Sequence, residues 1–235
     1  MITGIVVALA EELSTLTSKK LVKGNYVFIN ENIVVAYSGA GPSNAQAAAK
    51  LLIAQGATQL ISWGCAAALS PALKPGDLVL ADSLIDSEGK LIELSTDWHS
   101  YTKNLFATTL KVQTGSLVES KKIVATGGDK QQLYRKTGAI ALDMESIAIA
   151  KVASQNKLRF LAIRAIVDPV TMDLPKAIGH SLNSAGDIEL IKLLAFIAGH
   201  PAELPGLIKL GLHFHAAKNT LKSVARQLAQ LCASV

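Results

Sequence analysis

The fold is decided by the first strand-like stretch, Ile2-Thr3-Gly4-Ile5-Val6-Val7-Ala8-Leu9. This run is almost wholly apolar and rich in branched residues, which predicts a β-strand buried on both faces. Phe160–Val167 is a second run of the same kind. Strands buried on both faces belong in a sheet with helices on each side, so the two runs predict an α/β fold.

The stretches between these two runs predict further strands and helices. We expect strands over 22–29, 33–38, 59–62, 77–81, 121–125 and 139–142, and helices over 43–55, 101–110 and 144–154. The glycine and alanine residues of 64–67 predict a turn, and 82–120 is polar and irregular. Because strands alternate with helices and no repeat or long linker divides the chain, we predict a single α/β domain with a largely parallel sheet.

Composition excludes several classes of protein. The chain has 235 residues, of which 50% are hydrophobic and 17% charged, so it is neither disordered nor a collagen or disulfide scaffold. Its two cysteines, Cys65 and Cys232, form no C-x-x-C motif, which fits a reducing cytoplasm. The N-terminus lacks the basic region of a signal peptide, and no apolar run reaches the ~18 residues of a membrane span.

The net charge of +5 is unevenly distributed. Residues 1–203 carry a net charge of +1, and residues 204–235 contribute Lys209, Lys218, Lys222 and Arg226 without any acidic residue. The chain is therefore a nearly neutral body with a basic tail, and we do not expect nucleic acid as a partner.

A glycine turn follows the predicted strand 33–38, with the sequence Ser38-Gly39-Ala40-Gly41-Pro42-Ser43-Asn44-Ala45. It lacks the third glycine of a dinucleotide fingerprint because Asn44 occupies that place. Backbone N–H groups of such a turn can hold an anion or a water molecule before a helix. The alternative is that the glycines only make a tight connection between strand and helix.

Acidic residues end two other predicted strands. Asp143 and Glu145 lie where a strand meets a helix, where they could also serve only as helix caps. Asp168 ends a strand among Ile166, Val167 and Pro169, so we expect partial desolvation to raise its pKa, as a general acid requires. A simple turn role is the alternative for Asp168.

These stretches, with Gly4–Leu13, resemble the nucleoside phosphorylase and methylthioadenosine/S-adenosylhomocysteine nucleosidase superfamily. The resemblance runs in order over about residues 2–170 and includes 62–69 and 73–79, where the family has a glycine-rich turn and a G-D-[ILV]-V strand. It implies a central mixed sheet, largely parallel and partly barrel-like, flanked by helices. It also implies an enzyme that cleaves N-ribosyl bonds.

The resemblance assigns roles to individual residues. Asp168 matches the acid that protonates purine N7, Glu145 the glutamate that binds the ribose hydroxyls, and Glu12 the glutamate that acts on the attacking water. The other matching positions are expected to hold the sugar, the water or a phosphate: Ser38, Gly39, Gly41, Gly64, Cys65, Asp143, Met144 and Arg164. For Arg164, an ion pair with a buried carboxylate is the alternative.

The resemblance implies no metal and no organic cofactor, with inorganic phosphate or water as co-substrate, and a homodimer. The base-binding loop matches only loosely at 126–130 and the chain from there to Asp143 is short, which leaves the contacts to adenine open. Hydrolysis and phosphorolysis are both open, because Val167 stands where hydrolytic members have serine and 38–45 contains no arginine. Against phosphate, the Glu12 carboxylate would repel a dianion by about 1 kcal/mol or more.

The residues after Asp168 resemble the hopanoid-associated phosphorylase branch of the superfamily, through Asp168-Pro169, Asp173-Leu174-Pro175 and the tail from His200. This resemblance implies adenosylhopane as the substrate and a cytoplasmic protein that can lie at the inner membrane face. The alternatives are a methylthioadenosine/S-adenosylhomocysteine nucleosidase and a catalytically silent nucleoside-binding protein. A nicotinamide-dependent dehydrogenase fits least well.

The tail 201–235 is expected to be an amphipathic helical extension of the phosphorylase-like domain 1–200. Lys218, Lys222 and Arg226 recur every four residues and share a helix face. Two interpretations stay open: a helix docked on the domain with its basic side in solvent, or an interfacial helix on anionic lipid. His213 and His215 are two residues apart and do not form a metal pair on a helix.

Overall fold

A mixed sheet forms the centre of the computed structural model, which describes residues 1–94, 96–181 and 190–233. Strand β1 (Ile2–Val7) lies between β3 (Ile33–Tyr37) and β4 (Ala57–Ala68) and is parallel to both. On the other side of β4, strand β9 (Arg159–Asp168) runs parallel to it and pairs antiparallel with β5 (Leu78–Ile85).

The sheet closes on itself on this side, because β4, β8, β7, β5 and β9 pair in a ring. The expected single α/β domain with a mixed, partly barrel-like sheet is thereby confirmed. The remaining elements are β2 (Asn25–Asn30), β6 (Leu91–Glu93), β7 (Val112–Glu119), β8 (Ala141–Asp143), α4 (Gly127–Thr137), α6 (Lys176–Ser181), α7 (Leu190–Gly199), the short 3₁₀ helix Pro201–Glu203 and α9 (Leu228–Ala233).

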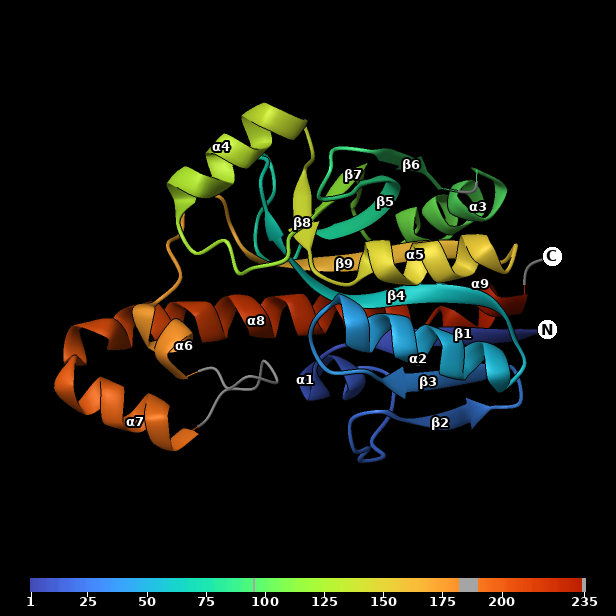
Figure 1. Cartoon of the computed structure of the whole chain (residues 1–235), viewed down its shortest axis with the longest axis horizontal. Helices are drawn as coiled ribbons and strands as arrows, with labels where there is room; N and C mark the ends of the chain where they lie inside the picture. Colours follow the sequence, from blue (N-terminus) through green and yellow to red (C-terminus); the bar gives the residue numbers. More distant parts are fainter. Residues whose placement is uncertain (95, 182–189, 234–235) are drawn as a thin grey trace.

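Helices cover both faces of the sheet, as the apolar first strand predicts. Helices α2 (Pro42–Ala54) and α5 (Ser146–Gln155) pack side by side on one face, and α3 (Thr96–Ala107) and α8 (Leu204–Ala225) contribute to the other (Figure 1). Within β1, Val6 packs toward the first face while Ile5 and Val7 pack toward the second. The alternation follows from the two-residue period of a strand.

Several predicted elements differ from the structure. Residues 64–67 do not form a turn but continue β4. The strand predicted over 121–125 is not formed, and the observed strand β7 ends before it, at Glu119. The segment 82–120, expected to be irregular apart from the helix at 101–110, contains the end of β5 together with β6 and β7, and its helix α3 begins earlier, at Thr96. The small residues of 64–67 are strand-forming here because pairing with β9 and β8 supplies their hydrogen bonds, which local propensity does not register.

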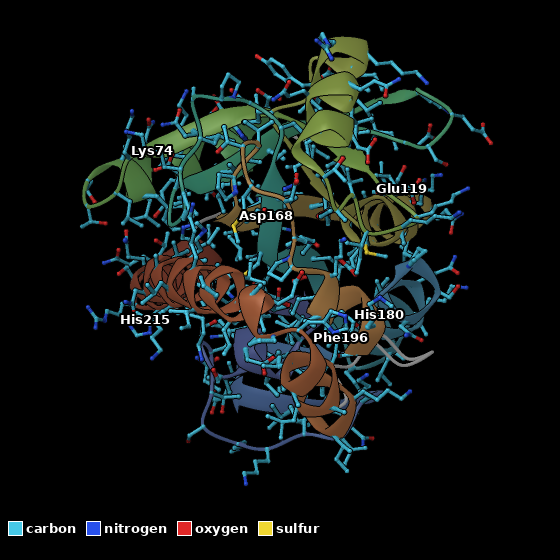
Figure 2. The ribbon with its side chains drawn as sticks, turned by 90° about the vertical axis from the view of Figure 1, so that its left-hand side faces the viewer. Lys74, Glu119, Asp168, His180, Phe196 and His215 are labelled. Carbon is cyan, nitrogen blue, oxygen red and sulfur yellow. The ribbon has the colours of Figure 1, made fainter. Side chains whose placement is uncertain are left out.

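The parallel strands β1, β4 and β9 end at the same edge of the sheet, where ligands bind in open α/β folds. Helix α1 (Ala10–Leu13) follows β1 directly and brings Glu12 to this edge. Asp168 is the last residue of β9 and lies near the middle of Figure 2, which looks onto this edge of the sheet.

Helix α8 has two different halves. Its C-terminal half docks on the domain, where Ala217, Leu221 and Val224 are buried and Thr220 Oγ1 donates a 2.6 Å hydrogen bond to the Gly76 carbonyl. Its N-terminal half extends past the sheet beside α6 and α7 (Figure 1). Within the described residues, no single helix is long and apolar enough to cross a membrane. Only the pair Ile191–Gly199 and Pro201–Ala225 has that length and apolarity when taken together, and the two helices are bent by 110°.

Candidate active site

A cavity of about 290 Å³ opens at the edge where β1, β4 and β9 end. Its wall combines acidic side chains with an apolar surface. The lining residues are Ala8, Leu9, Glu12, Ala40, Cys65, Ala66, Ala67, Lys122, Ile123, Val124, Leu142, Asp143, Met144, Glu145, Val167, Asp168, Leu174, Leu210 and Phe214. An apolar pocket with a few convergent polar groups is the usual form of a small-molecule site.

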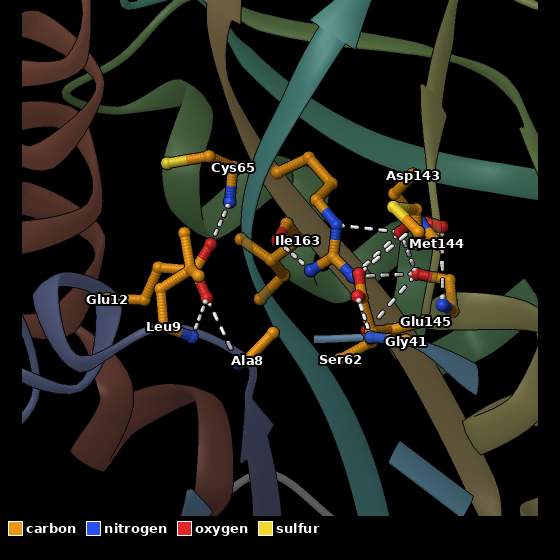
Figure 3. A network of polar contacts seen from close by, with 12 residues as sticks. Ala8, Leu9, Glu12, Gly41, Ser62, Cys65, Asp143, Met144, Glu145 and Ile163 are labelled. Carbon is orange, nitrogen blue, oxygen red and sulfur yellow. Dashed lines mark hydrogen bonds and ion pairs between the residues drawn. The ribbon is translucent and has the colours of Figure 1, made fainter. Parts of the chain in front are cut away.

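Backbone N–H groups hold the Glu12 carboxylate in place. Ala8 N and Leu9 N donate to Oε2 over 3.1 and 3.0 Å, and Cys65 N donates to Oε1 over 2.8 Å (Figure 3). Burial raises the pKa of Glu12, and these hydrogen bonds together with the Arg164 charge oppose that shift. The result is an oriented carboxylate with a pKa moved toward neutrality, which suits a general base.

Gly64 gives Glu12 the space that it occupies. A Cβ atom at position 64 would overlap the Glu12 carboxylate, so a glycine is needed where β4 passes this side chain. Gly64 therefore contributes to the site indirectly, because it leaves room for the Glu12 carboxylate.

A second polar cluster lies beneath the cavity and is centred on Arg164. Its Nε and Nη2 atoms each lie 2.7 Å from Asp143 Oδ2, and Nη2 also donates to Ser62 Oγ over 2.5 Å and to Ser146 Oγ over 3.0 Å. Burial alone would lower the pKa of Arg164, but the carboxylates of Asp143, Glu145 and Glu12 raise it. Arg164 thus forms an ion pair with a buried carboxylate, which the sequence left open as the alternative to a role in substrate binding. Asp143 orients that arginine.

Glu145 connects this cluster to the glycine turn. Gly41 N donates to Glu145 Oε1 over 2.9 Å, so the turn holds a carboxylate of the protein itself. Burial raises the pKa of Glu145 to about 7, and the nearby Asp143 charge adds to this shift. Met144, the preceding residue, lines the cavity beside it.

Asp168 lies in the cavity wall with an ammonium group behind it. Lys130 Nζ lies 2.6 Å from Asp168 Oδ2, while Oδ1 is buried and no donor among the described residues reaches it. Burial raises the pKa of Asp168, whereas the Lys130 hydrogen bond and charge oppose the rise. The carboxyl group therefore has one oxygen held by an ammonium group and one buried oxygen without a donor among the described residues.

The predicted site residues fall into two groups. Six of them line the cavity and five do not: the first group is Glu12, Cys65, Asp143, Met144, Glu145 and Asp168, and the second is Ser38, Gly39, Gly41, Gly64 and Arg164. Ser38 Oγ donates to the Val7 and Gly39 carbonyls over 3.0 and 2.8 Å, so its hydroxyl stabilises the turn. Burial and the Glu12 charge raise the pKa of Cys65 well above its usual value, which keeps its thiol protonated.

Sequence reasoning missed Lys130 and the apolar part of the wall. The segment 126–130 was expected to be a base-binding loop, but it forms the start of α4, with Thr126 as its N-cap. The sequence signal for the cap was present, since Thr126 is followed by Asp129 three residues later. Leu174, Leu210 and Phe214 reach the wall from later segments, which no local pattern predicts.

Metal ligands do not gather in this part of the molecule. Across residues 1–94, 96–181 and 190–233, no three His, Cys, Asp or Glu side chains are placed to hold a metal ion together.

Comparison with known proteins shows the family of the chain. Residues 3–189 match the phosphorylase superfamily. The chain is 28% identical over 198 residues to the 5′-methylthioadenosine/S-adenosylhomocysteine nucleosidase of Baumannia cicadellinicola, covering 72% of this chain and 86% of the relative. It is 32% identical over 101 residues to the nucleosidase of the same name from Thermotoga maritima, covering 40% of this chain and 46% of that protein.

Solved structures show the same fold. A methylthioadenosine/S-adenosylhomocysteine nucleosidase from Neisseria meningitidis, in complex with methylthio-immucillin-A, superposes with a TM-score of 0.72 at 19% identity over 97% of this chain and 99% of that one. The futalosine hydrolase of Helicobacter pylori superposes with a TM-score of 0.70 at 18% identity, over 97% of this chain and 96% of that one. The family match covers most of the chain, and the predicted enzyme class of nucleoside phosphorylases and nucleosidases is confirmed. This chain belongs to the phosphorylase superfamily.

Proposed function

We propose that the chain hydrolyses the N-glycosidic bond of an adenosyl compound and releases adenine. The observation that carries this proposal is the convergence of Glu12, Glu145 and Asp168, all with raised pKa values, on one cavity. Groups poised in this way suit acid–base chemistry better than binding alone. The names of the curated relatives, methylthioadenosine/S-adenosylhomocysteine nucleosidases, support an adenosyl substrate, and the complex of the Neisseria nucleosidase with methylthio-immucillin-A supports a small molecule.

Asp168 supplies the proton of the leaving group in this proposal. As the bond between ribose C1′ and purine N9 breaks, its electron pair moves onto the purine, and Asp168 Oδ1 gives its proton to N7. A raised pKa keeps that proton on Asp168 at higher pH than an exposed aspartate would allow. In this proposal the proton is carried by Oδ1, which no donor among the described residues reaches.

Glu145 and Met144 hold the ribose. Glu145 lies beside the expected sugar position with its carboxyl anchored by Gly41 N. When it is ionised, its negative charge favours the positive charge that develops on the ribosyl ring in the transition state.

Water fits the position of the nucleophile better than phosphate does. Glu12 accepts three backbone hydrogen bonds and lines the cavity, where it can take a proton from water as its oxygen bonds to C1′. A phosphate dianion in the same place would meet this carboxylate. The Arg164 guanidinium that could offset the repulsion is bonded to Asp143.

The first test is adenine release from methylthioadenosine, with and without inorganic phosphate. We expect free methylthioribose in both cases, and a sugar 1-phosphate formed only with phosphate would contradict the hydrolytic assignment. Asp168→Asn should lower turnover by about 10²-fold or more, because general acid catalysis contributes that much. Near-normal adenine release by a folded Asp168→Asn variant would contradict the role of Asp168.

Adjacent glutamates offer a matched control for the nucleophile. Glu12 is buried in the cavity wall, whereas Glu11 beside it is exposed. We expect Glu12→Gln to lower turnover by about 10²-fold and Glu11→Gln to leave it unchanged. Equal effects of the two substitutions would exclude Glu12 as the base.

A second candidate substrate is adenosylhopane, which carries a large apolar group on the ribose. Leu210 and Phe214 of α8 line the cavity, and Leu204, Ile208 and Leu212 of the same helix are exposed at 43%, 61% and 66%. This run of apolar side chains from the cavity to the surface favours a substrate with a long apolar group. Comparing kcat/KM for adenosylhopane in detergent with that for methylthioadenosine decides between the two substrates.

A further inference from the structure

The geometry points to Lys130 as a positioning residue that fixes the orientation of the Asp168 carboxyl group and stabilises the carboxylate left after proton transfer. This inference rests on the proposed role of Asp168 as the general acid. Lys130 does not line the cavity, and it acts only through the aspartate in front of it.

Lys130 is buried to an extent unusual for a lysine. Its side chain is 0% exposed, and its Nζ contacts Asp168 Oδ2 at 2.6 Å, the Met172 carbonyl at 2.7 Å and the Pro169 carbonyl at 3.3 Å. A lysine is almost never fully buried unless it is paired, because desolvating an ammonium group is costly. These three polar contacts go to Asp168 and to the loop that follows it.

The start of α4 is fixed against that same loop. Gly127 N donates to Asp173 Oδ1 over 2.7 Å, and Leu174 N donates to the Ala125 carbonyl over 2.8 Å. A Cβ atom at position 127 would lie 2.7 Å from the Val170 carbonyl oxygen, so the close approach requires glycine. These contacts between the start of α4 and the loop after Asp168 fix the position of the Lys130 ammonium beside Asp168.

This arrangement makes the two oxygens of Asp168 unequal. Oδ2 is held by Lys130, and Oδ1 is buried without a donor from the described residues. The proton therefore resides on Oδ1, the oxygen that neither the ammonium group nor another donor of the described residues holds. When Oδ1 gives the proton to the leaving purine, the new negative charge forms 2.6 Å from an ammonium group. Solvent returns the proton after the purine has left.

Few other charges act on Asp168. Asp173, in the loop opposite α4, raises its pKa, whereas Lys130 lowers it against the dominant effect of burial. From α8, His213 bonds the backbone of the neighbouring Val167, and the adjacent Lys209 acts on that imidazole. Lys130 is thus the cation that keeps Asp168 from becoming too weak an acid.

The test compares Lys130→Met with the wild type in steady-state kinetics of adenine release across pH. Activity that needs protonated Asp168 declines as pH rises through its pKa, which defines the basic limb of the profile. Without the ammonium, we expect this limb to move up by about one pH unit or more. We expect kcat to fall by about tenfold to a hundredfold while KM stays within about threefold.

Controls separate this role from a structural one. Lys136→Met, at the exposed end of the same helix, should leave the profile unchanged. Lys130→Arg keeps the charge and should keep the limb near its wild-type position. If Lys130→Met does not fold, Lys130→Gln takes its place, since its amide can still donate to the loop carbonyls. Reduced activity with an unmoved basic limb would overturn the inference.

A measurement without substrate distinguishes failure of the inference from failure of the proposed function. The ¹³Cγ resonance of Asp168, assigned by its loss in Asp168→Asn, can be titrated in the wild type and in the Lys130 variant. An upward shift of its pKa in the variant supports the pairing even if methylthioadenosine and adenosylhopane are both left intact. An identical titration in both proteins overturns it, whatever the enzyme cleaves.

Discussion

At the scale of single residues, the site depends on carboxyl groups that the fold keeps out of water. Glu145 is the clearest case, because burial and the neighbouring Asp143 charge raise its pKa from 4.5 to about 7. The folded protein therefore holds this proton more tightly than the unfolded chain does. The resulting contribution to stability is fully present below pH 4.5 and is lost as pH rises from 4.5 to 7.

Glu145→Gln should remove this pH dependence, because an amide keeps the shape and the acceptor for Gly41 N but does not ionise. Relative to the variant, the wild type should lose about 3 kcal/mol of unfolding free energy over that interval. Urea unfolding of both proteins at about pH 5 and about pH 8 measures the difference. Glu11→Gln, with an exposed side chain, should show the same pH dependence of the unfolding free energy as the wild type. If Glu145→Gln also shows the wild-type pH dependence, Glu145 ionises normally.

At the scale of elements, α8 performs two tasks along one helix. Leu221 is fully buried against the sheet, whereas Leu212 is 66% exposed in the half that extends past it. Leu→Ala changes helix propensity little at either position, so burial decides the outcome. We expect Leu221→Ala to lower the unfolding free energy by about 2–5 kcal/mol and Leu212→Ala to change it by less than about 0.5 kcal/mol.

Urea denaturation of the two variants checks this expectation. A small effect of Leu221→Ala would mean that α8 is held by other contacts, such as the hydrogen bond from Thr220 to Gly76. A large effect of Leu212→Ala in the absence of lipid would show that the exposed half is covered in solution.

Sequence patterns predicted the buried strands well because their signal is local. The apolar runs at β1 and β9 fix both the strands and their burial, and Glu12 in the helix after β1 and Asp168 at the end of β9 line the cavity. The strand placed near 121–125 was wrong because the observed β7 contains Gln113, Thr114, Gly115 and Ser116, and it is formed by pairing with β5. Lys130 gave no signal, since its partner lies 38 residues away and the contact depends on the loop that follows Asp168.

At the scale of the whole molecule, two of the four basic residues of the tail, Lys222 and the C-cap residue Arg226, lie on the exposed side of α8. Its exposed side runs through Leu204, Ile208 and Leu212 and continues through His215, Asn219, Lys222 and Arg226, residues spaced three or four apart. His215 lies at the outer edge of the molecule in Figure 2. The apolar part adjoins the cavity through Leu210 and Phe214, and the basic part follows along the same face.

This face has the chemistry of a surface that rests on anionic lipid, and we propose that contact for the chain. The wild type should cosediment with phosphatidylglycerol vesicles and less with phosphatidylcholine vesicles, because each basic residue near such a surface contributes about 1 kcal/mol. The pair Ile208→Ser and Leu212→Ser should lower the bound fraction about tenfold or more. Val22→Ser removes a side chain that is 73% exposed elsewhere and should have no effect.

Size-exclusion chromatography of the same variants distinguishes lipid from a second copy of the chain as the partner of this face. If Ile208→Ser and Leu212→Ser together convert a dimer to a monomer and vesicle binding is absent, the face is a subunit interface. If vesicle binding falls while the oligomeric state is unchanged, the apolar half of α8 reaches the bilayer. The active-site cavity would then open where an adenosyl compound with an apolar group is held, and cleavage of adenosylhopane should increase on vesicles while cleavage of methylthioadenosine should not.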